Sequence, residues 1–398
     1  MNITIQPGQL HGTVAAIPSK SHAHRLLICA AFADKPTQLH CPAINRDIEA
    51  TADCLQALGA GITRTEDGFR IQPAAEIPKT AQLNCCESGS TLRFMLPIVG
   101  ALGVDATFLM EGRLPQRPLS PLWEEMERMG CRLSRPTSNT IRCTGQLASG
   151  NYQIDGGVSS QFITGLLFAC ALLPQGGSIR VVGKLESEPY VNMTRQALSV
   201  FGVSTENLTV MPGSKLISPI HLDVEGDWSN GAFFLAANAI GQEVQVTGLD
   251  TSSAQGDKAA DYLLRQLRHK CSISAADIPD LVPIMAVVAA AHEGAEFTDI
   301  RRLRIKESDR VASVIAMLEA LGGKAEATED TLTVFPCRFT GGTVDSFSDH
   351  RIAMAAAIAA TAASAPVTIL GAECVSKSYP GFWDDYRNLG GQYEQHLR

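Results

Sequence analysis

Residues 301–323 read RRLRIKESDRVASVIAMLEALGG, a basic segment that runs directly into a helical pattern. In the second half of this stretch, apolar residues recur at intervals of three and four, which places one apolar stripe along a helix. The stripe consists of Val311, Val314, Ile315, Leu318 and Leu321. Gly322 follows it, and glycine commonly ends a helix because it accepts the left-handed conformation. The stretch therefore predicts a helix that begins near residue 310 and ends at this glycine.

The basic segment before this helix has the character of an anion site. It holds five fixed cations in ten residues, although the formal net charge of the chain is −8. A capping residue, Ser308 or Asp309, would start the helix. The N-terminal end would then carry Lys306, Glu307 and Arg310, where free N–H groups and the helix dipole favour anions. A solvated run of charges is the simpler interpretation of the segment alone, so the hypothesis depends on similar clusters elsewhere.

An apolar residue followed by a helix-ending glycine recurs along the chain. Each copy follows a helical pattern and precedes a short strand-like stretch: Leu58-Gly59, Met129-Gly130, Phe201-Gly202, Leu321-Gly322 and Leu389-Gly390. The first three glycines are 71 and 72 residues apart, and the last two are 68 residues apart. The middle gap of 120 residues contains a degenerate copy at 267–270. This pattern predicts about six units of βα type, of which the one from 270 to 322 is shortened.

Chain length and repeat number together predict the domain organisation. A chain of 398 residues is too long for one core, and six units divide into two α/β domains of three units each. The chain would cross between the domains near Pro18-Ser19 and near Gly226-Asp227. The first predicted domain is therefore 1–18 together with 227–398, and the second is 19–226. The N-terminal strand would belong with the C-terminal half.

Composition and charge argue against several classes of protein. The sequence pI of about 5.6, without a long basic block, disfavours nucleic-acid binding. The longest apolar run, 281–291, is shorter than the roughly 18 residues that suggest a membrane span, and residues 1–20 lack a signal-peptide pattern. The eleven cysteines include no Cys-x-x-Cys, and the nine histidines show no metal-ligand spacing. We expect a cytoplasmic protein with reduced thiols, no metal, and no nucleic-acid or membrane partner.

Six further clusters place basic, serine or glycine residues at predicted helix starts or in stiff loops. They are Ser19 to Arg25, Glu87 to Arg93, Arg113 to Pro118, Ser159 to Gln161, Ser348 to Arg351 and Ser376 to Pro380. Taken singly, each cluster is most often only a capped helix or an exposed loop. Because the clusters recur in successive units, the set as a whole indicates a site for small polyanionic molecules.

Strings spread over almost the whole chain, in the same order, resemble those of the 5-enolpyruvylshikimate-3-phosphate synthase family. They are Pro18-Ser19-Lys20-Ser21, Ser159-Ser160-Gln161-Phe162, Asp277-Ile278-Pro279-Asp280, Leu303 to Arg310, Asp349-His350-Arg351 and Ser376 to Pro380. The resemblance implies two domains, each a pseudo-three-fold assembly of βαβαββ-type units (an inside-out α/β barrel), with the active site in the interdomain cleft. It also implies that no metal or organic cofactor is needed, and we expect a monomer.

The same resemblance implies an activity, that of a 3-phosphoshikimate 1-carboxyvinyltransferase in the shikimate pathway of aromatic amino-acid biosynthesis. Such an enzyme transfers the enolpyruvyl group of phosphoenolpyruvate to the 5-hydroxyl of shikimate 3-phosphate and releases phosphate, by addition and then elimination. Both substrates carry a phosphate and a carboxylate, so bringing them together requires many cations. Arginine suits both groups because it binds them with two parallel hydrogen bonds.

The resemblance further assigns residues to each substrate. For shikimate 3-phosphate it implies Lys20, Ser21, Arg25, Ser159, Ser160, Gln161, Ser187, Tyr190, Asp280 and Lys306. For phosphoenolpyruvate it implies Lys20, Gly89, Arg93, Arg117, Gln161, Arg310, Arg351 and Lys377. Lys20 belongs to both groups and to the expected catalytic set.

Two carboxylates complete that catalytic set. Asp280 would accept the proton of the 5-hydroxyl, and Glu307 would protonate the methylene carbon of phosphoenolpyruvate and later remove a proton from it. Such chemistry needs a positioned acid and a separate base, which two carboxylates in different surroundings can provide. From the local sequence alone, a helix cap is an equally good interpretation of Asp280.

Two positions depart from the family pattern, and two alternative functions stay open. The loop Glu87-Ser88-Gly89-Ser90 differs from the usual Asn-Ala-Gly-Thr, and Arg302 stands where some members have asparagine. One alternative is the sister enolpyruvyl transferase that acts on UDP-N-acetylglucosamine, whose members often have a cysteine in the loop corresponding to 113–118; none is present here. The other is a non-catalytic protein that binds phosphorylated metabolites, which would not need both carboxylates.

Overall fold

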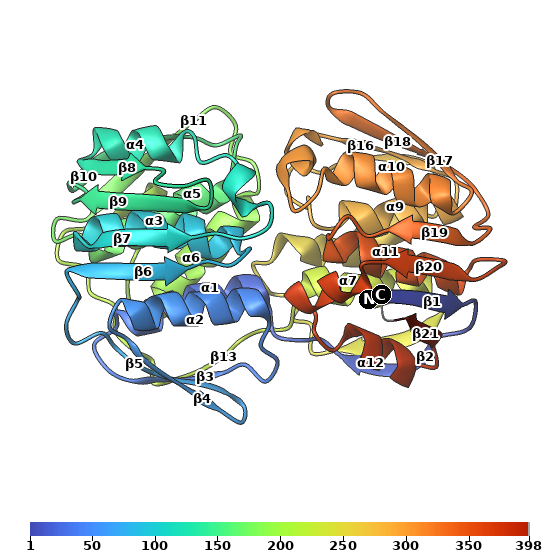
Figure 1. The fold of residues 1–398 in the computed structure, drawn as a ribbon, viewed down its shortest axis with the longest axis horizontal. Coiled ribbons are helices and arrows are strands. Elements are labelled where there is room, and N and C mark those ends of the chain that lie inside the picture. Colours follow the sequence, from blue (N-terminus) through green and yellow to red (C-terminus); the bar gives the residue numbers. More distant parts are fainter. Residues whose placement is uncertain (397–398) are drawn as a thin grey trace. The chain divides into compact units, whose positions relative to one another are not determined.

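The computed structural model describes residues 1–396 and forms two compact units. Unit 1 comprises Met1–Ile17 and the chain from Glu225 onward, and unit 2 comprises Pro18–Val224. Within the described residues, each unit holds six α-helices and three β-sheets (Figure 1). The mixed α/β architecture, with three sheets and a helical interior in each unit, is the one that the sequence predicted.

Unit 2 contains three sheets with the strand orders β13-β3-β5-β4, β6-β7-β9-β8 and β10-β11-β12. Their strands are β3 (Thr37–His40), β4 (Gly61–Thr65), β5 (Gly68–Gln72), β6 (Thr80–Asn84), β7 (Asp105–Leu109), β8 (Cys131–Ser134), β9 (Thr140–Gly145), β10 (Gly150–Asp155), β11 (Gly177–Val182), β12 (Thr209–Val210) and β13 (His221–Asp223). The helices are α1 (Lys20–Ala31), α2 (Arg46–Ala57), α3 (Gly89–Leu102), α4 (Leu122–Arg128), α5 (Ser160–Leu172) and α6 (Glu188–Val200), with 3-10 turns η1 (Leu114–Gln116) and η2 (Glu206–Leu208).

Unit 1 has the strand orders β19-β20-β1-β21, β15-β16-β18-β17 and β14-β2. Its strands are β1 (Asn2–Gln6), β2 (His11–Ala15), β14 (Glu243–Thr247), β15 (Cys271–Ser274), β16 (Ala295–Thr298), β17 (Lys324–Ala327), β18 (Thr331–Phe335), β19 (Gly342–Asp345), β20 (Val367–Leu370) and β21 (Gln392–His396). Its helices are α7 (Trp228–Ala239), α8 (Ala260–Gln266), α9 (Val282–Ala291), α10 (Arg310–Ala320), α11 (His350–Thr361) and α12 (Phe382–Asn388), with 3-10 turns η3 (Gly256–Ala259), η4 (Arg301–Ile305) and η5 (Ala372–Lys377).

The most apolar helices occupy the interior of each unit. The sequence of α9, VPIMAVVAAA, offers no polar face, and such a helix is stable only when it is surrounded by protein. In unit 1, α7, α9 and α11 contact one another, and in unit 2, α3 packs against α5. The N-terminal strand β1 pairs antiparallel with β20 and β21, so the first residues of the chain complete a sheet of the C-terminal unit.

The predicted helix-ending glycines are found where the repeat placed them. The helices α2, α4, α6, α10 and α12 each end two residues before a glycine of positive φ, with one C-cap residue between; these glycines are Gly59, Gly130, Gly202, Gly322 and Gly390. A strand follows closely in four of these five cases. The prediction was wrong after Gly202, because η2 intervenes and β12 begins only at Thr209.

The shortened unit lacks a β-hairpin. In unit 2, helix α2 is followed by β4 and β5 before β6, whereas in unit 1 helix α8 leads directly to β15, so the β14-β2 sheet has two strands in the described chain. Asn238 covers the exposed edge of β14: its Nδ2 donates to the carbonyl of Val244 at 2.6 Å, and the Val244 N–H donates to its Oδ1 at 2.7 Å. One side-chain amide thus takes the hydrogen bonds that a neighbouring strand would make.

Within residues 1–396, no helix has both the length and the apolar character needed to cross a membrane.

Candidate active site

The three serine-headed clusters of unit 2 are helix starts. Ser19 caps α1 by accepting a hydrogen bond from the N–H of His22, Ser88 caps α3 by accepting from Thr91, and Ser159 caps α5 by accepting from Gln161. Each cap satisfies one backbone N–H and leaves others of the first turn available to an anion. The predicted clusters therefore have the local structure that anion binding requires.

Arg25 connects the residues that were assigned to shikimate 3-phosphate. Its side chain is buried, and Nη1 donates to the carbonyl of Ser21 at 2.6 Å while Nη2 donates to the carbonyl of Tyr190 at 2.8 Å. Its Nε donates to Thr194 Oγ1 at 2.9 Å. All three acceptors are uncharged oxygens, so the guanidinium is held in place while its charge is not neutralised by them.

Ser187, a further residue assigned to this substrate, has a strained backbone. It precedes α6 and has φ of 55°, the left-handed region that residues other than glycine adopt rarely. Backbone strain of this kind is often found at functional sites, where surrounding contacts hold it. Helix α6 packs against both α1 and α5, so Ser187 and Tyr190 belong to the same helical group as Arg25 and Ser160.

A second group in unit 2 gathers the residues that were assigned to phosphoenolpyruvate. Arg93 Nη1 donates to Gln161 Oε1 at 3.1 Å, and Gln161 Nε2 donates to Ser90 Oγ at 3.0 Å. A methyl group added at Gly89 would lie 2.6 Å from Arg93 Nη1 and 2.7 Å from Arg117 Nη1. The position must therefore be glycine for both guanidinium groups to approach the start of α3.

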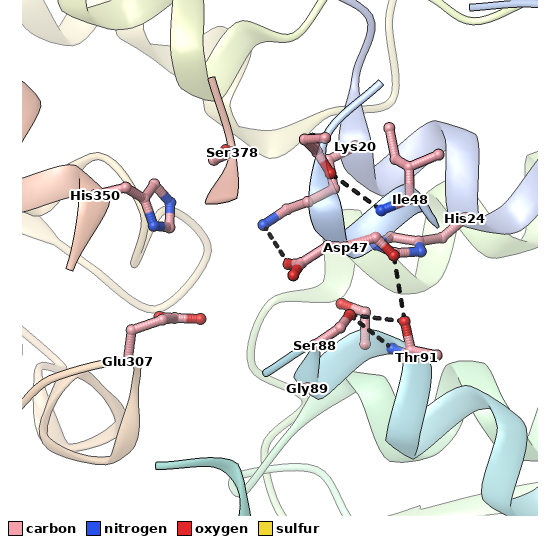
Figure 2. Close-up of polar contacts among 12 residues, drawn as sticks. Lys20, His24, Asp47, Ile48, Ser88, Gly89, Thr91, Glu307, His350 and Ser378 are labelled. Carbon is pink, nitrogen blue, oxygen red and sulfur yellow. Dashed lines mark hydrogen bonds and ion pairs between the residues drawn. The ribbon is translucent and has the colours of Figure 1, made fainter. Parts of the chain in front are cut away.

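Lys20 is paired with a carboxylate that the sequence analysis did not identify. Its Nζ lies 3.0 Å from Asp47 Oδ2, and Figure 2 shows this ion pair beside Ser88 and Gly89. Asp47 lies in the first turn of α2, where an acidic residue is common because it complements the helix dipole. No sequence signal distinguishes it from an ordinary helix-start acid.

In unit 1, Arg310 is enclosed by three carboxylates, which we call the Arg310 cage. Nη1 lies 2.6 Å from Asp280, Nη2 lies 2.7 Å from Glu307, and Nε lies 2.9 Å from Asp349. The guanidinium is 1% exposed, whereas the Asp280 and Glu307 side chains are 21% and 17% exposed. The two expected catalytic carboxylates therefore share one arginine and both remain accessible to small molecules.

Asp280 does not cap a helix. Helix α9 begins two residues later, and the residue in its cap position, Leu281, makes no side-chain cap. Asp280 instead receives a second arginine, because Arg351 Nη2 donates to its Oδ2 at 2.9 Å. The interpretation of Asp280 as a simple cap is wrong.

The sequence predicted that either Ser308 or Asp309 caps α10. The cap is Asp309, and Ser308 instead donates a hydrogen bond to Asp349.

The charges around Asp280 determine how it ionises. Burial alone would raise the pKa of Asp280, but Arg351, Arg310 and Lys306 outweigh that effect and hold the pKa well below its usual range. Loss of water around Lys306 lowers the pKa of that amine to about 8, although Asp280 opposes the shift. In this arrangement Asp280 is an anion with little tendency to accept a proton.

The structure collects the predicted residues in two groups within unit 2 and one group within unit 1. Lys377 lies at the end of η5, which packs against α11, the helix that carries Arg351. Arg302, at a departure from the family pattern, donates from Nη2 to the carbonyl of Ala276 at 2.8 Å. Among residues 1–396, no group of three or more His, Cys, Asp or Glu side chains is arranged to hold a metal ion.

The sequence analysis also did not identify two acidic residues of unit 1, Asp349 and Asp257. Asp349 was visible only as part of an Asp-His-Arg string and a helix cap, and its contact with Arg310 spans 39 residues. Asp257 is buried and accepts a hydrogen bond from Ser229. Burial and the charge of Asp280 raise the pKa of Asp257 to about 7. Neither contact leaves a local pattern in the sequence.

Comparison with known proteins relates this chain to one family. The family model described as EPSP synthase (3-phosphoshikimate 1-carboxyvinyltransferase) matches residues 5–386. A 3-phosphoshikimate 1-carboxyvinyltransferase of Clostridium kluyveri is 36% identical, with 99% of this chain and 98% of that protein covered. One of Clostridium beijerinckii is 35% identical over the same shares.

Solved structures show the same fold. An EPSP synthase of Acinetobacter baumannii superposes with a TM-score of 0.80 at 23% identity, covering 99% of this chain and 100% of that one. The enolpyruvyl transferase NikO of Streptomyces tendae superposes with a TM-score of 0.75 at 17% identity, covering 100% and 99%. At these identities, the likeness supports the two-domain α/β fold expected from the sequence.

Proposed function

The chain belongs to the EPSP synthase family, and on that premise we propose that it transfers the enolpyruvyl group of phosphoenolpyruvate to the 5-hydroxyl of shikimate 3-phosphate. The observation that carries the proposal is the Arg310 cage, because it combines two accessible carboxylates with buried arginines. Anion binding alone would need the arginines without the acids. Two positioned carboxylates supply the acid and the base that an addition and elimination require.

Unit 2 supplies most of the proposed binding groups. Ser21, Arg25, Ser159, Ser160, Ser187 and Tyr190 would bind shikimate 3-phosphate, and Gly89, Arg93, Arg117 and Gln161 would bind phosphoenolpyruvate. Lys20, held by Asp47, would contact both substrates. Support comes from the clustering of these residues at helix starts, where backbone N–H groups add to the side-chain donors.

Phosphoenolpyruvate binding would change the state of Asp280. In the cage, Arg310 and Arg351 both donate to Asp280 and hold its pKa low. If the anionic groups of phosphoenolpyruvate take over these arginines, Asp280 loses the contacts that stabilise its charged form. Its pKa then rises, and it becomes able to accept the proton of the 5-hydroxyl as that oxygen attacks C2.

Glu307 would act as the acid and then as the base at the methylene carbon. In its protonated form Glu307 would donate a proton to C3 while the 5-hydroxyl oxygen bonds to C2 and its proton passes to Asp280, which gives a tetrahedral intermediate that still carries the phosphate. Elimination then returns a proton from C3 to Glu307 as the C2–O bond to phosphate breaks. Lys306 would contact the shikimate side, and Lys377 would bind phosphoenolpyruvate. The accessible carboxylate of Glu307 next to Arg310 supports this role.

A turnover assay tests the proposal against the two alternatives. The purified protein is mixed with phosphoenolpyruvate and, separately, with shikimate 3-phosphate or UDP-N-acetylglucosamine, and phosphate release is measured. Release only with shikimate 3-phosphate is expected. Release with the nucleotide sugar would identify the sister transferase, and binding without release would identify a non-catalytic protein.

We also infer that the protein acts in the cytoplasm as a monomer that needs no metal or organic cofactor. All eleven cysteines, which lie within the described residues, are free thiols, and burial raises the pKa of Cys29, Cys85 and Cys170. Buried thiols of this kind act as small apolar side chains in a reducing environment. Light scattering at working concentration tests the monomer, and full activity after dialysis against a chelator tests the independence from metal.

A further inference from the structure

A chain of buried hydroxyl groups connects helix α1 to the loop at the start of α3. His24 Nδ1 lies 2.7 Å from Thr51 Oγ1, and Thr51 Oγ1 lies 2.7 Å from Thr91 Oγ1. Thr91 Oγ1 then donates to Ser88 Oγ at 2.7 Å. All four side chains are fully buried. Figure 2 shows the end of this chain, where Thr91 meets Ser88 immediately before Gly89.

Counting protons fixes the direction of every bond in this chain. A threonine hydroxyl has one proton, and the proton of Thr91 is given to Ser88, with the carbonyl of Asp47 as a longer second acceptor at 3.5 Å. The bond between Thr51 and Thr91 must therefore use the proton of Thr51. The bond between His24 and Thr51 must then use a proton on Nδ1.

The surroundings of His24 agree with this count. Burial lowers the pKa of His24 to about 3, so the ring is neutral and carries one proton. Its Nε2 is buried and has no hydrogen-bond partner among residues 1–396, which suits a nitrogen without a proton. Phe94 meets the ring edge to face with a centroid distance of 6.2 Å and helps to hold its orientation. His24 is thus the neutral Nδ1–H tautomer and the first donor of the chain.

The neighbouring residue, Arg25, leads to a separate chain. Arg25 Nε donates to Thr194 Oγ1, and Thr194 Oγ1 lies 2.8 Å from Thr164 Oγ1. Thr194 gives its proton to the carbonyl of Tyr190, so Thr164 must donate to Thr194. Adjacent residues of α1 therefore serve the two proposed substrate groups separately, with His24 connected to the Gly89 loop and Arg25 to α5 and α6.

We propose that His24 is a positioning residue for phosphoenolpyruvate, acting through Thr51 and Thr91 to fix Ser88 and the backbone of Gly89. This inference rests on the proposed function. Ser88 Oγ accepts hydrogen bonds from both the N–H and the hydroxyl of Thr91, which uses its two lone pairs. Its remaining role is to donate its own proton, beside the glycine that Arg93 and Arg117 approach. A shift of this loop would alter phosphoenolpyruvate binding while the Arg25 chain stays intact.

Matched variants at His24 test the proposal, because asparagine and glutamine amides overlay different ring nitrogens. His24→Asn places an N–H at the position of Nδ1, whereas His24→Gln places it at the position of Nε2. His24→Leu has no donor. We expect His24→Leu and His24→Gln to raise KM for phosphoenolpyruvate about tenfold with KM for shikimate 3-phosphate within about threefold, and His24→Asn to stay near wild type. Thr164→Val, in the hydrogen-bonded chain that begins at Arg25, should raise KM for shikimate 3-phosphate instead.

Second variants and a direct measurement keep the test decisive if a His24 variant does not fold. Thr51→Val should reproduce the phosphoenolpyruvate effect, and Thr51→Ser should not. Long-range ¹H–¹⁵N correlation spectra should show the proton of the His24 ring on Nδ1. Equal effects of the Asn and Gln variants, equal changes in both KM values, or a proton on Nε2 would overturn the proposal. An inactive wild-type protein would instead refute the proposed function, while the spectra would still test the tautomer.

Discussion

The two units hold their arginines in different ways. In unit 2, Arg25 donates to two backbone carbonyls and a threonine. In unit 1, Arg310 and Arg351 donate to carboxylates. Neutral acceptors orient a guanidinium and leave its charge for a ligand, whereas carboxylates neutralise it until a stronger anion replaces them.

This difference separates binding from chemistry. In unit 2, Arg25 is held by neutral acceptors, whereas Lys20 is paired with Asp47. In unit 1, the carboxylates of the Arg310 cage neutralise the arginines. If an anionic substrate took over the contacts of Arg310 and Arg351 with Asp280, Asp280 could act as a base. Without that exchange, Arg351 and Arg310 hold the pKa of Asp280 low, so that Asp280 stays ionised. The comparison predicts that changing the carboxylates of the Arg310 cage affects kcat and that changing Arg25 affects KM.

The largest effect is expected from Glu307→Gln. The variant keeps the size of the side chain and one acceptor oxygen for Arg310, but it cannot cycle a proton. We expect kcat to fall by about 10²–10⁴, the usual contribution of a positioned acid or base. Affinity for shikimate 3-phosphate, measured by calorimetry, should stay within a few-fold because the proposed binding residues Ser21, Arg25 and Ser159 are unchanged. A near wild-type kcat would reduce Glu307 to a structural partner of Arg310.

A large effect on stability is expected at the buried side of the cage. Asp349→Asn keeps an oxygen to cap α11 but removes the charge that faces Arg310 Nε. Removing one partner from a buried ion pair costs about 3–5 kcal/mol, and we expect the lower end because Asp280 and Glu307 remain. Thr194→Val removes a neutral acceptor of Arg25 and should cost less, about 1.5 kcal/mol, the lower end for a hydrogen bond to a charged group. Urea unfolding measures both, and equal losses would contradict the contrast between the units.

The substrate phosphate tests the binding half directly. Shikimate without its 3-phosphate leaves the donors assigned to that group without an acceptor. Each lost hydrogen bond to a charged group is worth roughly 1.5–3 kcal/mol, so kcat/KM should fall by about tenfold or more for each one. Steady-state rates with shikimate and shikimate 3-phosphate measure the ratio. Comparable kcat/KM values would show that these residues do not recognise the phosphate.

A smaller and gradual effect is expected from pH. The pKa of Lys306 is lowered to about 8, from 10.5 in an unfolded chain. Between these values the unfolded chain binds more protons, so this residue makes folding more favourable as the pH rises. Activity should change in the opposite direction to stability. Because a neutral Lys306 binds anions poorly, kcat/KM should fall above about pH 8. Lys306→Arg should move that fall to higher pH, and an unmoved profile would assign it to another group.

The sequence predicted features that depend on local patterns. The helix after Asp309 and the glycines that end five helices follow from periodicity and backbone conformation, and structure agrees with them. The shortened unit was also visible, since the missing hairpin removes residues between two repeats. The roles of Asp280 and Glu307 entered through family resemblance, because their own neighbourhoods are equally compatible with a cap and a surface charge.

Contacts between distant residues could not be predicted. The bond from Arg351 to Asp280 spans 71 positions, and that from Arg310 to Asp349 spans 39. The chain His24, Thr51, Thr91 and Ser88 joins three helices through residues that are individually unremarkable in the sequence. Such contacts depend on how helices pack, and packing leaves no signal at the level of residue spacing.

The central claim is that Glu307 transfers a proton to and from the methylene carbon of phosphoenolpyruvate. Incorporation of deuterium into that methylene group from deuterated water, followed by mass spectrometry of the recovered substrate, measures this step directly. With shikimate 3-phosphate present, the wild-type protein should incorporate deuterium and Glu307→Gln should not. Equal incorporation by the two proteins would contradict the account and assign the proton transfer to another residue.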